Sequence, residues 1–165
     1  MNTALRPALL TVFGLGHLRP APGTWGSAAA VCFCMGMLWS GMSPQAITVA
    51  MLVLVVVFGA VCVALGRWSE THYGKSDPSE VVADEVAGQA LALMFLPWHA
   101  PGDGTLWNLA MAGTAFAAFR FFDILKPPPI NQIQRAPAGW GILLDDLLAG
   151  AAALAVVQLV FRVLV

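Results

Sequence analysis

The sequence carries little charge. Only 10% of its 165 residues are Asp, Glu, Lys or Arg, whereas ordinary soluble domains carry about 25%. Hydrophobic residues make up 59% of the chain, and the mean hydropathy is +0.77. The helices of a soluble globule need a polar face, for which this composition leaves too few polar residues. The length suits a single domain over residues 1–165, and the composition predicts a membrane protein.

Several functional classes lack their defining features here. The net charge is −1 and no basic run occurs, so no nucleic-acid partner is expected. The three cysteines, Cys32, Cys34 and Cys62, stand in apolar stretches without the spacing of a zinc site or a disulfide framework. The Gly-x-x-x-x-Gly-Lys phosphate loop is absent. No Ser-His-Asp or Cys-His pattern is present, so covalent catalysis has no support.

What remains is a series of long apolar stretches, which predicts five helices. The stretch 46–65 is uncharged and has about the 20 residues needed to cross the hydrocarbon. Asp77, Pro78 and Glu80 form a capping-box pattern that predicts a helix start, and Pro127–Pro129 must end the helix before them. We expect an all-α, polytopic helical membrane protein. Its five predicted helices cover residues 26–42, 46–65, 78–96, 106–126 and from 142 onward, and at least four of them are expected to span the membrane.

The basic residues predict a topology. They fall in alternate connections, as expected when Lys and Arg stay on the cytoplasmic side. The N-terminus and the second and fourth connections are therefore predicted to be cytoplasmic, because they carry Arg6, Arg19, Arg67, Lys75, Lys126 and Arg135. Asp103 is the only acid assigned to the external loops.

This topology gathers acidic residues at one membrane face. Five of the nine acids fall near helix ends on the cytoplasmic side: Asp84, Glu85, Asp123, Asp145 and Asp146. Acids in apolar helices are costly and need partners, ions or water. Carboxylates crowded together resist joint ionisation, and oxygen ligands suit Mg²⁺. The pattern predicts a metal site, although solvated helix ends or structural ion pairs are the alternative.

Cations accompany these acids. Arg120 and Lys126 each lie three residues from Asp123, and they supply a forked donor and a point charge for a phosphate. Upstream, residues 22–27 (PGTWGS) stand at a predicted helix start, where glycines and the helix N-terminus favour an anion. Thr24 and Ser27 could donate hydroxyls to it. An ordinary helix start is the alternative, and this segment taken alone favours it.

Four segments resemble the phosphatidylglycerophosphatase A family, in the family's order: residues 22–27, 77–88 (DPSEVVADEVAG), 119–129 (FRFFDILKPPP) and 139–150 (GWGILLDDLLAG). The resemblance implies a multi-pass enzyme of the bacterial inner membrane. Such an enzyme would hydrolyse phosphatidylglycerophosphate to phosphatidylglycerol and phosphate, with Mg²⁺ as cofactor.

The hypothesis assigns a role to each candidate residue. The metal ligands would be Asp84, Glu85, Asp123, Asp145 and Asp146, of which Glu85, Asp123 and Asp146 are the catalytic candidates. The phosphate would be bound by Arg120, Lys126, Thr24 and Ser27.

Two other classes of function stay open at this stage. A small ion or proton-coupled transporter would also use intramembrane acids, but near the bilayer midplane and usually on broken helices. A non-catalytic membrane assembly partner would use the acids as interhelical pairs. Oligomeric state, metal count and acyl-chain preference do not follow from the sequence.

Overall fold

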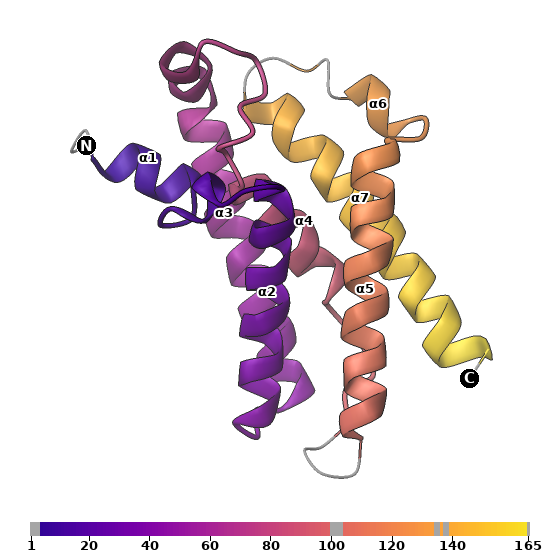
Figure 1. Cartoon of the computed structure of the whole chain (residues 1–165). Helices are drawn as coiled ribbons and strands as arrows, with labels where there is room; N and C mark the ends of the chain where they lie inside the picture. Colours follow the sequence, from indigo (N-terminus) through magenta and orange to yellow (C-terminus); the bar gives the residue numbers. More distant parts are fainter. Residues whose placement is uncertain (1–3, 100–103, 134–135, 137–138, 165) are drawn as a thin grey trace.

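A computed structural model describes residues 4–99, 104–133, 136 and 139–164, and within these ranges all regular secondary structure is helical (Figure 1). The predicted all-α fold is thereby confirmed. Arg135 and Asp103, used in the topology prediction, lie outside the described residues. The elements in order are α1 (Leu5–Leu10), η1 (Leu15–His17), α2 (Pro22–Trp39), α3 (Pro44–Tyr73), α4 (Ala83–Ala92), α5 (Thr105–Leu125), α6 (Ile130–Ile133), α7 (Gly139–Leu159) and the π-helical turn η2 (Val160–Leu164).

Three helical segments of the described chain are long and apolar enough to cross a membrane: Pro44–Tyr73, Thr105–Leu125 and Gly139–Val163. At least four spans were predicted, and the difference lies mainly in α4. This helix has 10 residues, so it is only about 15 Å long at 1.5 Å per residue. That length covers about half of a 30 Å hydrocarbon core.

The start of α4 differs from the prediction, which placed it at Pro78. The chain instead makes a turn, in which the Val81 N–H donates to the Pro78 carbonyl at 2.9 Å. The Val82 N–H then donates to the carbonyl of Leu10 in α1 at 3.0 Å. Glu80 does not cap the helix; its carboxylate pairs with the Lys75 ammonium at 3.1 Å. The capping-box prediction is wrong because these contacts hold residues 78–82 outside the helix.

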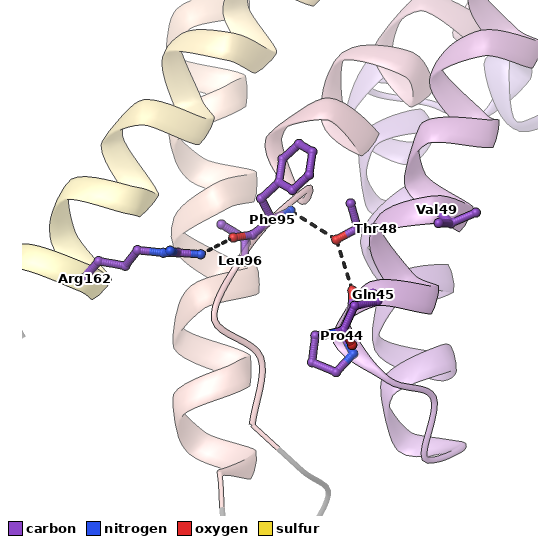
Figure 2. A pocket seen from close by; sticks show the side chains of 7 residues that line it. All are labelled: Pro44, Gln45, Thr48, Val49, Phe95, Leu96 and Arg162. Atoms are coloured by element: carbon purple, nitrogen blue, oxygen red, sulfur yellow. Dashed lines mark hydrogen bonds between the residues drawn. The ribbon is translucent and has the colours of Figure 1, made fainter.

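The end of α4 also comes earlier than the predicted Leu96. Phe95 has φ 56°, in the left-handed region that ends helices. Its N–H donates to Thr48 Oγ1 of α3, and its carbonyl accepts from Gln158 Nε2 and Arg162 Nη2 at 2.8 and 2.6 Å. Figure 2 shows Thr48 and Arg162 on two sides of the Phe95 backbone. Contacts far along the chain therefore fix the break.

The segment after α4 crosses the interior without helical structure. Leu93, Leu96 and Trp98 are all buried. Irregular backbone at membrane depth is tolerated where protein encloses it, and here α3, α5 and α7 surround the segment (Figure 1). The predicted third helix is thus a half-helix followed by a turn and a non-helical, largely buried segment.

The remaining helix ends follow local chemistry. α2 starts four residues before the predicted residue 26, with Pro22 in its first turn, a favoured position for proline. α3 begins after Ser43, whose hydroxyl accepts the Ala46 N–H at 3.2 Å. α3 ends at Tyr73, and Gly74 after it adopts φ 72°. α5 agrees with the prediction within one residue at each end, because the three prolines after Lys126 stop it.

Two glycines bring α4 and α7 into backbone contact. A Cβ added to Gly88 would stand 2.6 Å from the Asp146 carbonyl oxygen, and one added to Gly150 would stand 2.3 Å from the Gly88 carbonyl oxygen. Any side chain at either position would push the helices apart. Small residues serve this purpose in membrane helices, so Gly88 and Gly150 set the distance between the acids that precede them.

Candidate active site

Two buried carboxylates and one half-buried carboxylate meet where α4 packs against α7. Asp84 and Glu85 lie in the first turn of α4, and Asp146 lies about two turns into α7 rather than in its first turn. One oxygen from each of the three lies within 4.8 Å of the others. Asp84 and Asp146 are 4% and 3% exposed. Residues 62 positions apart in the sequence thus form one acidic cluster.

Asp123 joins this cluster from the last turn of α5. Its carboxylate interacts with that of Asp146, and its charge also acts on Glu85. The Arg120 guanidinium donates to Asp123 from Nη1 at 2.6 Å. The acids predicted to converge from three separate helices therefore do share one site.

The backbone of α2 lies directly against this site at Gly23. A Cβ at Gly23 would stand 2.0 Å from Glu85 Oε1 and 3.0 Å from Arg120 Nη1. The predicted phosphate-binding segment 22–27 is therefore beside the acids. Within it, Thr24 is half-buried, and the buried Ser27 hydroxyl donates to the Gly23 carbonyl at 2.9 Å. Gly23 was not among the predicted site residues.

Lys126 and Asp145 form an ion pair at the rim of the cluster. Burial lowers the pKa of Lys126, but its hydrogen bond to Asp145 and the nearby acidic charges outweigh burial and raise the pKa above its ordinary value. The ammonium is therefore charged at neutral pH. Asp145 uses one oxygen for this pair, which leaves the other for a further partner.

Several charged atoms of the site are buried without a hydrogen-bond partner among the described residues. They are Glu85 Oε2, Asp145 Oδ1, Asp146 Oδ2 and Arg120 Nε. An unmade hydrogen bond in the interior costs about 1–3 kcal/mol, and more for a charged group. Buried charged atoms of this kind are stabilised when a ligand binds to them. The three carboxylate oxygens fit a hard cation such as Mg²⁺, and the guanidinium N–H fits an anion.

Two residues near the cluster were not predicted as part of it. Asp77, read from the sequence as a helix cap, lies close enough for its charge to act on Asp84 and Asp145. Gln89 is fully buried, and neither of its amide atoms has a hydrogen-bond partner within the described part of the chain. Gln89 follows Glu85 by four residues, so the two share a helix face. That spacing is the signal that could have identified Gln89.

Comparison with known proteins identifies the family. Residues 8–161 match the family model described as phosphatidylglycerophosphatase A. The chain is 35% identical to phosphatidylglycerophosphatase A of Haemophilus influenzae over 88% of this chain and 82% of that protein. It is 33% identical to the Escherichia coli K12 protein of the same name, over 84% of this chain and 73% of that protein.

A further relative carries a different name. A Bacteroides thetaiotaomicron protein, provisionally named a phosphatidylinositol-3-phosphatase, is 33% identical over 88% of this chain and 89% of its own length. No solved structure matches the chain.

Proposed function

Because the chain belongs to the phosphatidylglycerophosphatase A family, we propose that it hydrolyses the terminal phosphate of phosphatidylglycerophosphate, with Mg²⁺, at the cytoplasmic face of a bacterial inner membrane. The family makes the chain a lipid phosphatase, and its apolar helices associate it with a membrane. One observation carries the proposal furthest: inside an apolar bundle, carboxylate oxygens and an arginine N–H of the same site have no partner among the residues that the structure describes.

The proposed metal ligands are Asp84, Glu85 and Asp146, whose oxygens lie within 4.8 Å of one another. Asp123 and Asp145 stand next to them as further candidates. When bound, Mg²⁺ would neutralise this charge, polarise a phosphoryl oxygen and make a water molecule more acidic. The donor set supports the assignment because every candidate ligand is a carboxylate oxygen.

The cations would hold the phosphate. Arg120 gives Nη1 to Asp123 and keeps Nε for a phosphoryl oxygen. Lys126 gives one of its three N–H donors to Asp145. The two acids thus position the cations, and the two positive charges offset charge that develops on the phosphoryl group. Thr24 could donate a further hydrogen bond, whereas Ser27 could do so only by releasing the Gly23 carbonyl.

The reaction is a hydrolysis in which water attacks phosphorus opposite the lipid oxygen. The bond from phosphorus to that oxygen breaks, and the products are phosphate and the lipid alcohol. Glu85 and Asp146 are the candidates for accepting the proton of water, because each has a free oxygen in the cluster. The protonated carboxyl group then gives this proton to the lipid oxygen, which leaves as the alcohol.

The distribution of basic residues supports the cytoplasmic assignment of this site. Lys75 precedes α4 and Lys126 follows α5, both at the end of the bundle that holds the acids. The opposite end has only Arg162 among the described residues. The positive-inside rule favours the first end as the cytoplasmic one.

Purified protein in mixed micelles would test the proposal by phosphate release. We expect release from phosphatidylglycerophosphate in Mg²⁺ and none after EDTA, with activity restored by added Mg²⁺. A phosphatidylinositol phosphate and phosphatidic acid serve as headgroup controls, and we expect both to react more slowly. Full activity in EDTA would remove the metal from the proposal, and preference for another headgroup would change the substrate.

The half-helix α4 is the one structural feature in favour of a transporter, since broken helices are common there. The acids, however, sit toward one end of the bundle. Flux of protons or cations in proteoliposomes, without phosphate release, would support the transporter and contradict the phosphatase.

A further inference from the structure

An apolar groove runs between α2 and α5 on the outside of the bundle. Its volume is about 310 Å³, and Ala28, Val31 and Met35 of α2 face Leu109, Gly113 and Phe116 of α5 across it. Each wall spans eight residues, 28–35 and 109–116, or about 10 Å of helix between its end residues. The groove lies along α5, which is long and apolar enough to cross a membrane, and its walls are apolar, so hydrocarbon is its natural contact.

The groove ends at the candidate active site. On α5, Phe116 at the end of the groove is one helical turn before Arg120. On α2, Ala28 is a little over one turn after Gly23. At that level the Arg120 guanidinium of α5 and the Glu85 carboxylate of α4 both lie against the backbone of α2 at Gly23. One gap is therefore apolar along its length and charged at its end.

We propose that this groove holds one acyl chain of the lipid substrate while the phosphate of the same molecule reaches Arg120 and the carboxylates. The inference rests on the proposed function and adds where the substrate lies. A lipid phosphate is joined to its acyl chains through glycerol, so its apolar and anionic parts need adjoining sites. The groove provides the apolar site, and the Arg120 guanidinium beside its end provides the anion site.

The groove would orient the lipid rather than increase its affinity. A chain that moves from the bilayer into a protein groove exchanges one apolar contact for another, so little hydrophobic free energy is gained. What the groove can supply is a fixed position for the phosphate, which accelerates a reaction through correct geometry.

Another apolar pocket, of about 330 Å³, lies on the opposite side of α5 against α7. Phe122, Leu148 and Pro127–Pro129 line it. The Arg120 and Glu85 side chains meet at Gly23 of α2, so they face the other gap. The α2–α5 groove is therefore the better site for a chain attached to the reacting phosphate.

Gly113→Leu tests the proposal by filling the groove. A Cβ at Gly113 would meet no described atom within 4 Å, so the larger side chain enters open space. Gly36→Leu is the matched control: Gly36 is also exposed in a long helix with open space around it, but it does not line the groove. Ala28→Leu, from the facing wall, is the second variant if Gly113→Leu does not fold.

The substrates are phosphatidylglycerophosphate with long acyl chains and its deacylated, water-soluble counterpart. For Gly113→Leu we expect kcat/KM on the lipid to fall roughly tenfold, the scale set by a misfit of a few methylenes in an apolar site. We expect less than a twofold change on the deacylated compound. Gly36→Leu should match the wild type on both.

The outcomes separate the two proposals. If the wild type hydrolyses the lipid and both groove variants match Gly36→Leu, the groove assignment is wrong and the proposed function stands. An equal loss on both substrates would also overturn it, because the defect would then not depend on the acyl chain. If the wild type releases phosphate from neither substrate, the proposed function fails and the groove assignment with it.

Discussion

The two ends of the helical bundle use polar groups in opposite ways. At the end near Phe95, the N–H of this residue donates to Thr48 and its carbonyl accepts from Gln158 and Arg162, and these three hydrogen bonds hold a left-handed residue in place. At the other end, Glu85, Asp146 and Arg120 have buried atoms for which the described residues offer no hydrogen-bond partner. Within the described ranges, the unpartnered groups near Phe95 are the neutral indole N–H groups of Trp98 and Trp107. Polar groups that satisfy one another fix the fold, whereas clustered charged atoms left unsatisfied indicate where a ligand binds.

Cavity volume alone would favour the Phe95 end, rather than the acidic end, as the active site. The pocket of about 380 Å³ beside Phe95, lined by Pro44, Val49 and Arg162 among others, is larger than the groove between α2 and α5. Its one charged residue already donates to the Phe95 carbonyl. The chemistry of the lining atoms therefore favours the acidic end as the active site, although the larger cavity is elsewhere.

The largest expected effect comes from removing a charge at the acidic end. Asp146→Asn keeps the size of the side chain but removes a proposed metal ligand, so we expect kcat to fall by about 10³-fold, within the range for loss of an acid–base or electrostatic group. Asp123→Asn should behave similarly. Phosphate release measures both. Turnover near the wild-type value in the two folded variants would end this site assignment.

The next largest effect is expected from Gly23→Ala, which tests whether α2 must lie directly against the acids. Gly23→Ala places a Cβ 2.0 Å from Glu85 Oε1, so the carboxylate must move, and we expect kcat/KM to fall by about 10²-fold. Gly36→Ala is the control in the same helix, because its Cβ meets open space. Equal activity in the two variants would mean that the contact at Gly23 has no role in catalysis.

Gln89→Met asks whether an unsatisfied amide always marks function. The change keeps the shape of a buried side chain and removes two unpartnered polar atoms, which is neutral or stabilising for folding. If the amide contacts substrate, we expect roughly a tenfold loss of activity with an unchanged or higher Tm. Wild-type activity combined with a higher Tm would show that Gln89 is a tolerated structural defect.

Arg162→Met tests the Phe95 end, where we expect a loss of stability rather than of activity. Loss of one donor to the Phe95 carbonyl should cost about 1 kcal/mol of stability, since Gln158 still donates to the same oxygen. The activity of the folded protein should stay within twofold of the wild type. Thermal unfolding in detergent measures the first quantity. A loss of activity as large as that of Asp146→Asn would erase the distinction between the two ends.

The smallest effect is expected at the surface pair of Lys75 and Glu80. Burial would raise the pKa of Glu80, but the Lys75 ammonium outweighs it and lowers the pKa below the ordinary value. The pair therefore adds stability above the unfolded-state pKa of about 4.3, and this is lost as pH falls through the lower folded-state pKa. Lys75→Ala should cost less than about 1 kcal/mol at pH 7. Unfolding curves that coincide at pH 7 but diverge in acid would contradict this sign.

Much of the acidic end could be predicted because charge is rare and costly in this chain. The alternation of Lys and Arg placed Asp84, Asp123 and Asp146 at one end, and the structure brings their side chains together. The end of α5 was predictable for a local reason, since three prolines follow Lys126.

The half-helix α4 could not be predicted, because its limits depend on distant residues. Phe95 is held by partners 47, 63 and 67 positions away, and residue 82 is bound by Leu10. The contact of Gly23 with Glu85 has the same origin. A local pattern such as the capping box at Asp77 competes with such contacts and loses when they bury more of the chain.

The central claim is that carboxylates from α4, α5 and α7 form one divalent-cation site at the acidic end. Binding of Mn²⁺ in place of Mg²⁺, followed by electron paramagnetic resonance on purified protein, tests it without relying on activity. We predict saturable binding that competes with Mg²⁺ in the wild type and in Arg162→Met, and loss of that binding in Asp146→Asn. Equal binding in Asp146→Asn, or none in the wild type, would contradict the claim.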